Sequence, residues 1–124
     1  MRLMAWLDGA VFEAEKFRVD APFVQQRIHT IGGVAYNLEQ HIDVLRRGSE
    51  ELFGFATVCT AQDAQRIISR LVEMSRIGGS LSVPVVMRID ANASLSFEVE
   101  KPTFGSIDLQ NIFYEIEEET EGID

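Results

Sequence analysis

Short runs of apolar residues separated by turn residues open the chain and predict paired strands. In residues 2–15, the Asp8-Gly9 pair separates two such runs, and it favours a tight hairpin because glycine accepts a positive φ without steric cost. Residues 23–36 mix β-branched, aromatic and polar side chains around Gly32-Gly33, which favours a second hairpin. Pro22 would set the entry to this second hairpin.

Apolar side chains spaced three and four residues apart then predict two helices. In the first helix, the stripe expected to be buried is Leu38, Ile42, Leu45, Ser49 and Leu52. Asn37 is expected to cap its N-terminus, and Gly54 is expected to end it. The second helix is expected to begin at Thr60, with Asp63 completing a box-like cap, and to end at Gly78-Gly79. Its expected buried stripe is Ala64, Ile67, Ile68, Leu71 and Val72.

After the helices, the apolar period changes to two. Residues 82–90 and 94–100 alternate between apolar and polar side chains, which predicts a hairpin across Ala91-Asn92 with one buried face. Pro84 has no N–H for a strand ladder, so we expect its strand at a sheet edge or the proline near the strand's start. Residues 112–116 are expected to add a last strand or a short helix.

The order of these elements, ββ-ββ-αα-ββ, predicts an α+β fold in which two α-helices pack on an antiparallel β-sheet. No internal repeat or linker interrupts the pattern, so residues 1–114 are expected to form a single domain. Residues 115–124 carry six acids and no base, which is most of the formal net charge of -9. We interpret them as a solvated acidic C-terminal tail.

The composition is that of one globular domain: 124 residues, 46% of them hydrophobic and 25% charged. The apolar runs are too short to cross a bilayer, and the N-terminal residues do not resemble a secretory signal, so no membrane partner is expected. The single cysteine, Cys59, cannot form an internal disulfide, which favours a cytoplasmic location. Basic residues form no stripe, so a nucleic-acid partner is not expected either.

Few residue patterns in the chain indicate a specific chemistry. Glycine-rich phosphate loops, the His-Glu-x-x-His zinc motif and Cys-x-x-Cys are all absent from the sequence. His29 and His41 are the only histidines and fit no ligand spacing, so no metal site is expected. We interpret both as surface or hydrogen-bonding groups, with His41 exposed near the start of its helix. Cys59 has no base beside it in the sequence and is interpreted as a small buried or half-buried side chain.

One segment resembles a known family. Residues 38–45 read Leu-Glu-Gln-His-Ile-Asp-Val-Leu, and they follow Gly-Val-Ala-Tyr-Asn at residues 33–37. This resembles the signature of class IV aminotransferases, the pyridoxal-phosphate enzymes of fold type IV, whose helix begins Leu-Glu-Glu-His-Leu-x-Arg-Leu. The resemblance extends over residues 21–55, and the branched-chain and D-amino acid aminotransferases and aminodeoxychorismate lyase are the most similar members. It implies the fold of the family's small N-terminal domain.

The departures from the family pattern concern the cofactor and substrate. Val44 stands where the family has the arginine that binds the cofactor phosphate, and a neutral side chain cannot pair with a dianion. Arg47 is the candidate cofactor-binding residue that could compensate. The family's Gly-Asp-Gly-x-Phe-Glu-Thr, near the substrate site, is matched by residues 21–27 without its glycines and acid. The family's catalytic lysine belongs to a larger C-terminal domain, and neither Lys16 nor Lys101 occupies a catalytic position.

The resemblance therefore implies an aminotransferase-like N-terminal domain that is not catalytic by itself and holds no cofactor alone. The alternative is one half of a split enzyme acting on amino acids, completed by a separately encoded large domain and pyridoxal phosphate. A pseudoenzyme serving as an interaction or small-ligand module and a truncated remnant are further alternatives. A homodimer or a complex with the large-domain partner is expected, because the small domain would otherwise expose apolar surface. The candidates for that surface are Trp6, Phe12, Phe23 and Phe104.

Overall fold

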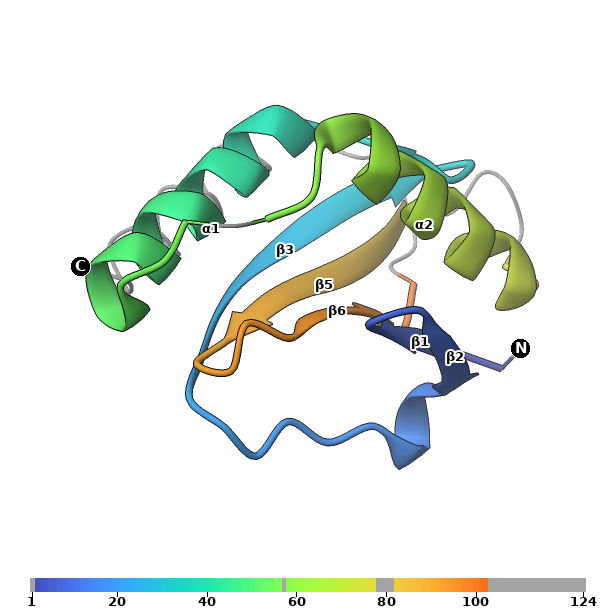
Figure 1. Cartoon of the computed structure of the whole chain (residues 1–124). Helices are drawn as coiled ribbons and strands as arrows, with labels where there is room; N and C mark the ends of the chain where they lie inside the picture. Colours follow the sequence, from blue (N-terminus) through green and yellow to red (C-terminus); the bar gives the residue numbers. More distant parts are fainter. Residues whose placement is uncertain (1, 57, 78–81, 103–124) are drawn as a thin grey trace.

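A computed structural model describes residues 2–56, 58–77 and 82–102. They form one six-stranded antiparallel sheet with two helices on one face (Figure 1), which confirms the expected α+β class and the order ββ-ββ-αα-ββ. The strands are β1 Met4–Leu7, β2 Ala10–Glu13, β3 Phe23–Ile31, β4 Val34–Ala35, β5 Ser82–Asp90 and β6 Leu95–Val99. The helices are α1 Leu38–Phe53, α2 Ala61–Met74 and the short 3-10 helix η1 Ala14–Lys16.

The strands lie in the order β2-β1-β6-β5-β3-β4, so each predicted hairpin is present and two long-range pairings join them. Asp8 and Gly9 turn β1 into β2 with φ values of 46° and 99°, a left-handed turn that matches the twist of the strands. Gly32 and Gly33 turn β3 into β4 in the same region of φ. The β3–β5 ladder runs the full length of both strands and joins the second hairpin to the third.

Pro84 lies in the interior of the sheet, because β5 pairs with β3 on one side and with β6 on the other. The expected edge position is therefore wrong, whereas its place near the strand's start is confirmed. Its carbonyl accepts a hydrogen bond from the N–H of Glu100 at 2.9 Å, one residue beyond the end of β6. The N–H that proline lacks would thus fall where the ladder ends. The prediction that only one face of this strand is buried is also wrong, since Ser82 and Val86 on the other face are buried too.

Helix α1 begins at Leu38 and ends before Gly54, as predicted, but Asn37 does not cap it. Gly54 closes it in the left-handed conformation at φ 83°, and its N–H bonds the carbonyl of Glu50. Asn37 is itself left-handed at φ 56° and makes no side-chain capping bond, so its expected capping role is wrong. Leu52 is 54% exposed and does not belong to the buried stripe. At this end of the helix Phe53 packs against the core in its place.

Helix α2 begins as predicted, because the hydroxyl of Thr60 accepts a hydrogen bond from the N–H of Asp63 at 3.1 Å. Its stripe is confirmed at Ala64, Ile68, Leu71 and Val72, which are buried, while Ile67 is partly buried. The helix ends at Met74, before the expected Gly78-Gly79, which lies outside the described residues.

The main core lies between the sheet and the two helices. Its largest fully buried apolar side chains are Phe97, Ile28, Leu45, Ile68, Leu71, Met87 and Ile89. On the opposite face, residues 14–22 cross beneath the sheet on their way from β2 to β3 (Figure 1). Ala14 and Phe17 of this crossing segment are buried against Ala5 of β1 and form a second, smaller core.

Two of the aromatic residues expected to be exposed are half-buried. Trp6 packs edge-on against Phe97, with 5.5 Å between ring centroids, and Phe12 packs against Phe17 at 5.6 Å. Phe23 is 41% exposed, as predicted. Phe104 lies outside the described residues.

The expected element at residues 112–116 and the acidic tail at 115–124 also lie outside the described residues, so these features and the domain boundary at residue 114 stay predictions. Neither helix in the described part of the chain is long and apolar enough to span a membrane.

Candidate functional site

Strand β3 divides the segment that matches the family's substrate-site motif between the two faces of the sheet. Val24 and Gln26 point toward the helices and are buried, while Gln25 and Arg27 point to the other face and are half-buried. We call the sheet surface opposite α1 and α2 the distal face. The polar and aromatic residues that define it are Phe23, Gln25, Arg27 and His29 of β3, Arg88 of β5, and Glu98 with the following Glu100 from β6.

Arg88 is the centre of a polar network on the distal face. Its Nε donates to Oε1 of Gln25 at 2.9 Å, and its Nη1 donates to Oε1 of Glu98 at 2.8 Å. Its guanidinium also lies over the rings of Phe23 and Phe17, at 5.3 and 5.8 Å from their centroids. With a side chain only 14% exposed, Arg88 links three strands to the crossing segment and holds that segment against the sheet.

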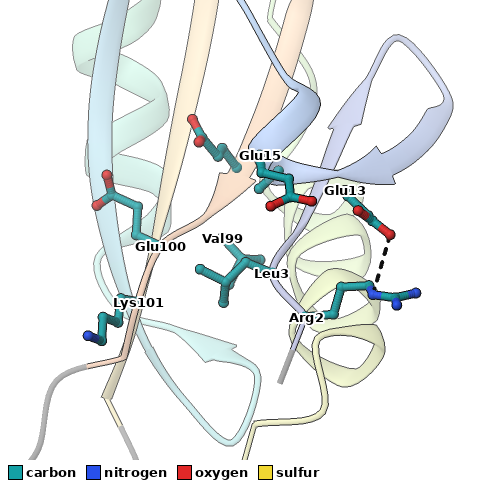
Figure 2. A pocket seen from close by; sticks show the side chains of 9 residues that line it. Arg2, Leu3, Glu13, Glu15, Val99, Glu100 and Lys101 are labelled. Atoms are coloured by element: carbon teal, nitrogen blue, oxygen red, sulfur yellow. Dashed lines mark ion pairs between the residues drawn. The ribbon is translucent and has the colours of Figure 1, made fainter.

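A second ion pair joins Arg27 to Glu100, with Nε 2.8 Å from Oε1. Glu100 also borders a hollow of about 630 Å³ between the start of β1, the end of β2 and the end of β6 (Figure 2). Its lining contains four glutamates against two basic residues, Arg2 and Lys101, and Arg2 is paired with Glu13 at 3.3 Å. This excess of carboxylates disfavours a phosphate group in the hollow.

Gln26 and His41 form a buried polar pair between β3 and α1. Nδ1 of His41 lies 2.7 Å from Oε1 of Gln26, and both residues are fully buried. The amide nitrogen of Gln26 donates to the carbonyl of Gln25, which orients its oxygen toward the ring. Nδ1 therefore donates, and Nε2 is left as a buried acceptor with no hydrogen-bond partner among the described residues.

The expected exposure of His41 is therefore wrong, although its interpretation as a hydrogen-bonding group is confirmed. Burial, and then the charge of His29, lower the pKa of His41 from 6.5 to about 4. The ring is thus neutral at pH 7. In the family pattern, Gln26 occupies the glutamate position of the substrate-site motif and His41 occupies the histidine position of the helix signature. The fold brings these two parts of the resemblance into direct contact.

The candidate phosphate position and its expected substitute on α1 differ in exposure. Val44 is buried, at 6% exposure. The side chain of Arg47 is 64% exposed, and its Nε pairs with Oδ2 of Asp43 at 3.2 Å on the outer surface of the helix. An exposed pair of this kind contributes little to stability. Arg47 thus lies at the surface one turn beyond the buried Val44, and its role as a cofactor-binding residue stays a prediction.

The two lysines and the cysteine differ in their exposure to water. Lys16 is exposed at the end of η1, and Lys101 is exposed at the border of the acidic hollow. Cys59 is half-buried, as predicted, and burial raises the pKa of its thiol, which disfavours the reactive thiolate. No group of three or more potential metal ligands occurs within residues 2–56, 58–77 and 82–102.

Sequence reasoning missed Arg88 and Gln26 as organising residues. A signal existed for Arg88, because it and Glu98 lie on the polar face of a hairpin that the pattern predicts. No comparable local signal existed for the pairing of Gln26 with His41 or of Arg27 with Glu100. Both depend on how β3 is placed in the sheet.

No protein-family model matches the chain, and no curated protein sequence does. Several solved structures share its fold. The branched-chain aminotransferase of Thermoproteus uzoniensis, solved with norvaline, has a TM-score of 0.61 and 19% identity, covering 86% of this chain and 42% of that one. An aminotransferase of Brucella abortus bound to the cofactor PLP has a TM-score of 0.62 and 12% identity, covering 87% and 44%. A Thermotoga maritima protein assigned as a branched-chain amino acid aminotransferase has a TM-score of 0.66 and 10% identity, covering 84% and 39%.

The chain thus spans about two fifths of the length of these proteins. Its fold is that of part of these aminotransferases, in agreement with the fold that the resemblance implies. At these identities the likeness concerns the fold alone.

Proposed function

We propose that this chain serves as the small domain of a fold type IV, pyridoxal-phosphate-dependent enzyme and has no aminotransferase activity by itself. The observation that carries the proposal is that the structural alignments cover most of this chain but less than half of the matched aminotransferases. The chain aligns over 81–87% of its own length with only 39–44% of the matched aminotransferases. More than half of a working enzyme of that kind therefore has no counterpart in these residues, and in the described part of the chain no second layer of α-helices covers the distal face.

The described residues do not fit the cofactor. A phosphate dianion needs arginine or backbone donors, whereas the position of the family's arginine holds the buried, neutral Val44. A lysine that forms a covalent bond with a carbonyl needs a lowered pKa in a dry pocket, whereas Lys16 and Lys101 are exposed to water. Arg47 would contribute to a phosphate site only if a larger domain brought that site to the outer surface of α1.

The partner in this proposal is a larger domain that supplies pyridoxal phosphate and its lysine, either in the same polypeptide or as a separately encoded chain. The separate chain is the split-enzyme version, with amino acids as substrates. A homodimeric assembly and a cytoplasmic location belong to the same proposal, as does a pseudoenzyme role if no such domain binds.

The first experiment is an absorption titration of the purified chain with pyridoxal phosphate, followed by borohydride reduction and peptide mapping. We expect no stoichiometric adduct and no turnover of branched-chain or D-amino acids, because exposed lysines react only weakly and without selectivity. Lys16→Arg and Lys101→Arg are the matched controls, since each keeps the charge and removes the amine. A stoichiometric adduct at one lysine, together with turnover that the matching variant abolishes, would overturn the proposal.

The second experiment purifies the chain from its native cell and asks whether a polypeptide containing a pyridoxal-phosphate-binding domain accompanies it or is fused to it. Aminotransferase activity in that complex, absent from the chain alone, is the expected result. A chain that occurs without any such domain would leave only the pseudoenzyme role.

A further inference from the structure

We propose that the buried pair of Gln26 and His41 is an acid-sensitive latch that holds the N-terminal half of α1 on the sheet. The two side chains join the middle of β3 to the end of the first turn of α1 through one short hydrogen bond of 2.7 Å. Both are fully buried, so water does not compete for this bond. The latch depends on a neutral imidazole, because the lone pair of Nε2 is buried as well.

Protonation would give the buried ring a positive charge and a second N–H donor. The side chains that the neighbouring elements turn toward α1 offer no charge to compensate it. They are Val24, Ile28 and Thr30 of β3, Val83, Val85, Met87 and Ile89 of β5, and Ala64, Ile68, Leu71 and Val72 of α2. On α1 itself, Glu39 and Asp43 are exposed on the outer surface. The titratable group that acts on the ring is His29 on the distal face of β3, and its charge opposes protonation.

Leu38 and Ile42 bury the apolar side of the first turns of α1 in the main core, but the backbone at the start of the helix lacks a side-chain cap. Asn37 provides no side-chain cap, whereas Thr60 caps the equivalent position of α2. The four leading N–H groups of a helix lack intrahelical partners, so a helix without a cap opens first at this end. The Gln26–His41 bond therefore adds a buried polar contact between this uncapped end of the helix and the sheet, beside the apolar packing of Leu38 and Ile42.

The direction of the pH effect follows from linkage. In the closed state the pKa of His41 is about 4, and in an open, hydrated state it returns to its ordinary value of 6.5. A group whose pKa is lowered by folding stabilises the closed state fully above 6.5 and loses that contribution as the pH falls toward 4. The opening constant of this segment should therefore rise about 20-fold between pH 7 and pH 5.

Amide hydrogen exchange on the full chain tests the latch, with rates corrected for the intrinsic effect of pH. We expect the opening constant of amides in residues 41–46 to rise about 20-fold from pH 7 to pH 5, while amides in residues 64–74 of α2 change by less than about threefold. His41→Gln cannot titrate, and in this variant the rise in α1 should disappear. An equal rise in both helices, or a rise that persists in His41→Gln, would overturn the latch.

Gln26→Glu provides a second variant, in which acidification should have the opposite effect on the contact. A carboxylate beside the ring favours its protonated form, so acidification should then tighten the contact and the 20-fold rise should be lost. An undiminished rise in Gln26→Glu would contradict the role of this pair. If neither variant folds, the comparison of α1 with α2 in the unmodified chain decides the matter, because the latch requires the two helices to differ.

Discussion

Replacing Leu45 by alanine should destabilise the chain far more than the same replacement at Leu52, although the two leucines lie seven residues apart on one helix. Leu45 is fully buried in the main core, whereas Leu52 is 54% exposed. Removing three buried carbon atoms costs about 2.4 kcal/mol in transfer free energy. The cavity left in a core that relaxes only partly adds about 1 to 2 kcal/mol, so Leu45→Ala should lower the free energy of unfolding by about 3.4 to 4.4 kcal/mol.

Leu52→Ala is the matched control, and its expected cost is below about 1 kcal/mol because the side chain already contacts water. Urea unfolding followed by the fluorescence of Trp6 measures both, since the chain has one tryptophan and its ring packs on Phe97 in the main core. An unchanged dependence on urea concentration would confirm that the two free energies can be compared. Equal losses for the two variants would refute the assignment of the buried face of α1.

Three further substitutions test single features of the fold. Arg88→Met should increase proteolytic cleavage within residues 14–22, because it removes two charge-assisted bonds and two ring contacts, whereas Arg47→Met should leave cleavage unchanged. Thr60→Ala should lower the free energy of unfolding by about 1 kcal/mol in urea, as the loss of an N-terminal cap does; a neutral result would show that this bond is dispensable. Gly54→Ala should lower the melting temperature, because an alanine at φ 83° carries about 1 to 2 kcal/mol of backbone strain. The added methyl group meets no atom within 4 Å, so a steric clash does not contribute, and an unchanged melting temperature would contradict backbone strain as the cause.

The two polar networks explain why the distal face differs in character from the face under the helices. Arg88 is nearly buried and satisfied by Gln25 and Glu98, whereas Arg27 and Glu100 remain about one-third exposed. Partly exposed ion pairs contribute little to folding, because water screens them. Removal of either Arg27 or Glu100 should therefore change stability much less than removal of Arg88.

The local elements of this fold could be predicted from the sequence. Asp8-Gly9 marks a hairpin, Thr60 caps a helix, and the spacing of Ala64, Ile68, Leu71 and Val72 defines a buried stripe. Each of these features depends on residues within about one or two turns of each other, where backbone sterics and side-chain periodicity act directly. The α+β class follows from the order of such elements.

The tertiary structure alone decided the strand order and the polar contacts of the candidate site. The interior strand β5 tolerates Pro84 because the ladder with β6 ends beside it. His41 is buried, and its ring meets Gln26 because β3 lies under α1. Arg27 meets Glu100 across 73 positions of sequence. Such contacts form only when separate hairpins join one sheet, and no local pattern encodes which hairpin lies beside which. The chemistry of a side chain is thus present in the sequence, whereas its burial, partner and protonation state depend on the assembled sheet.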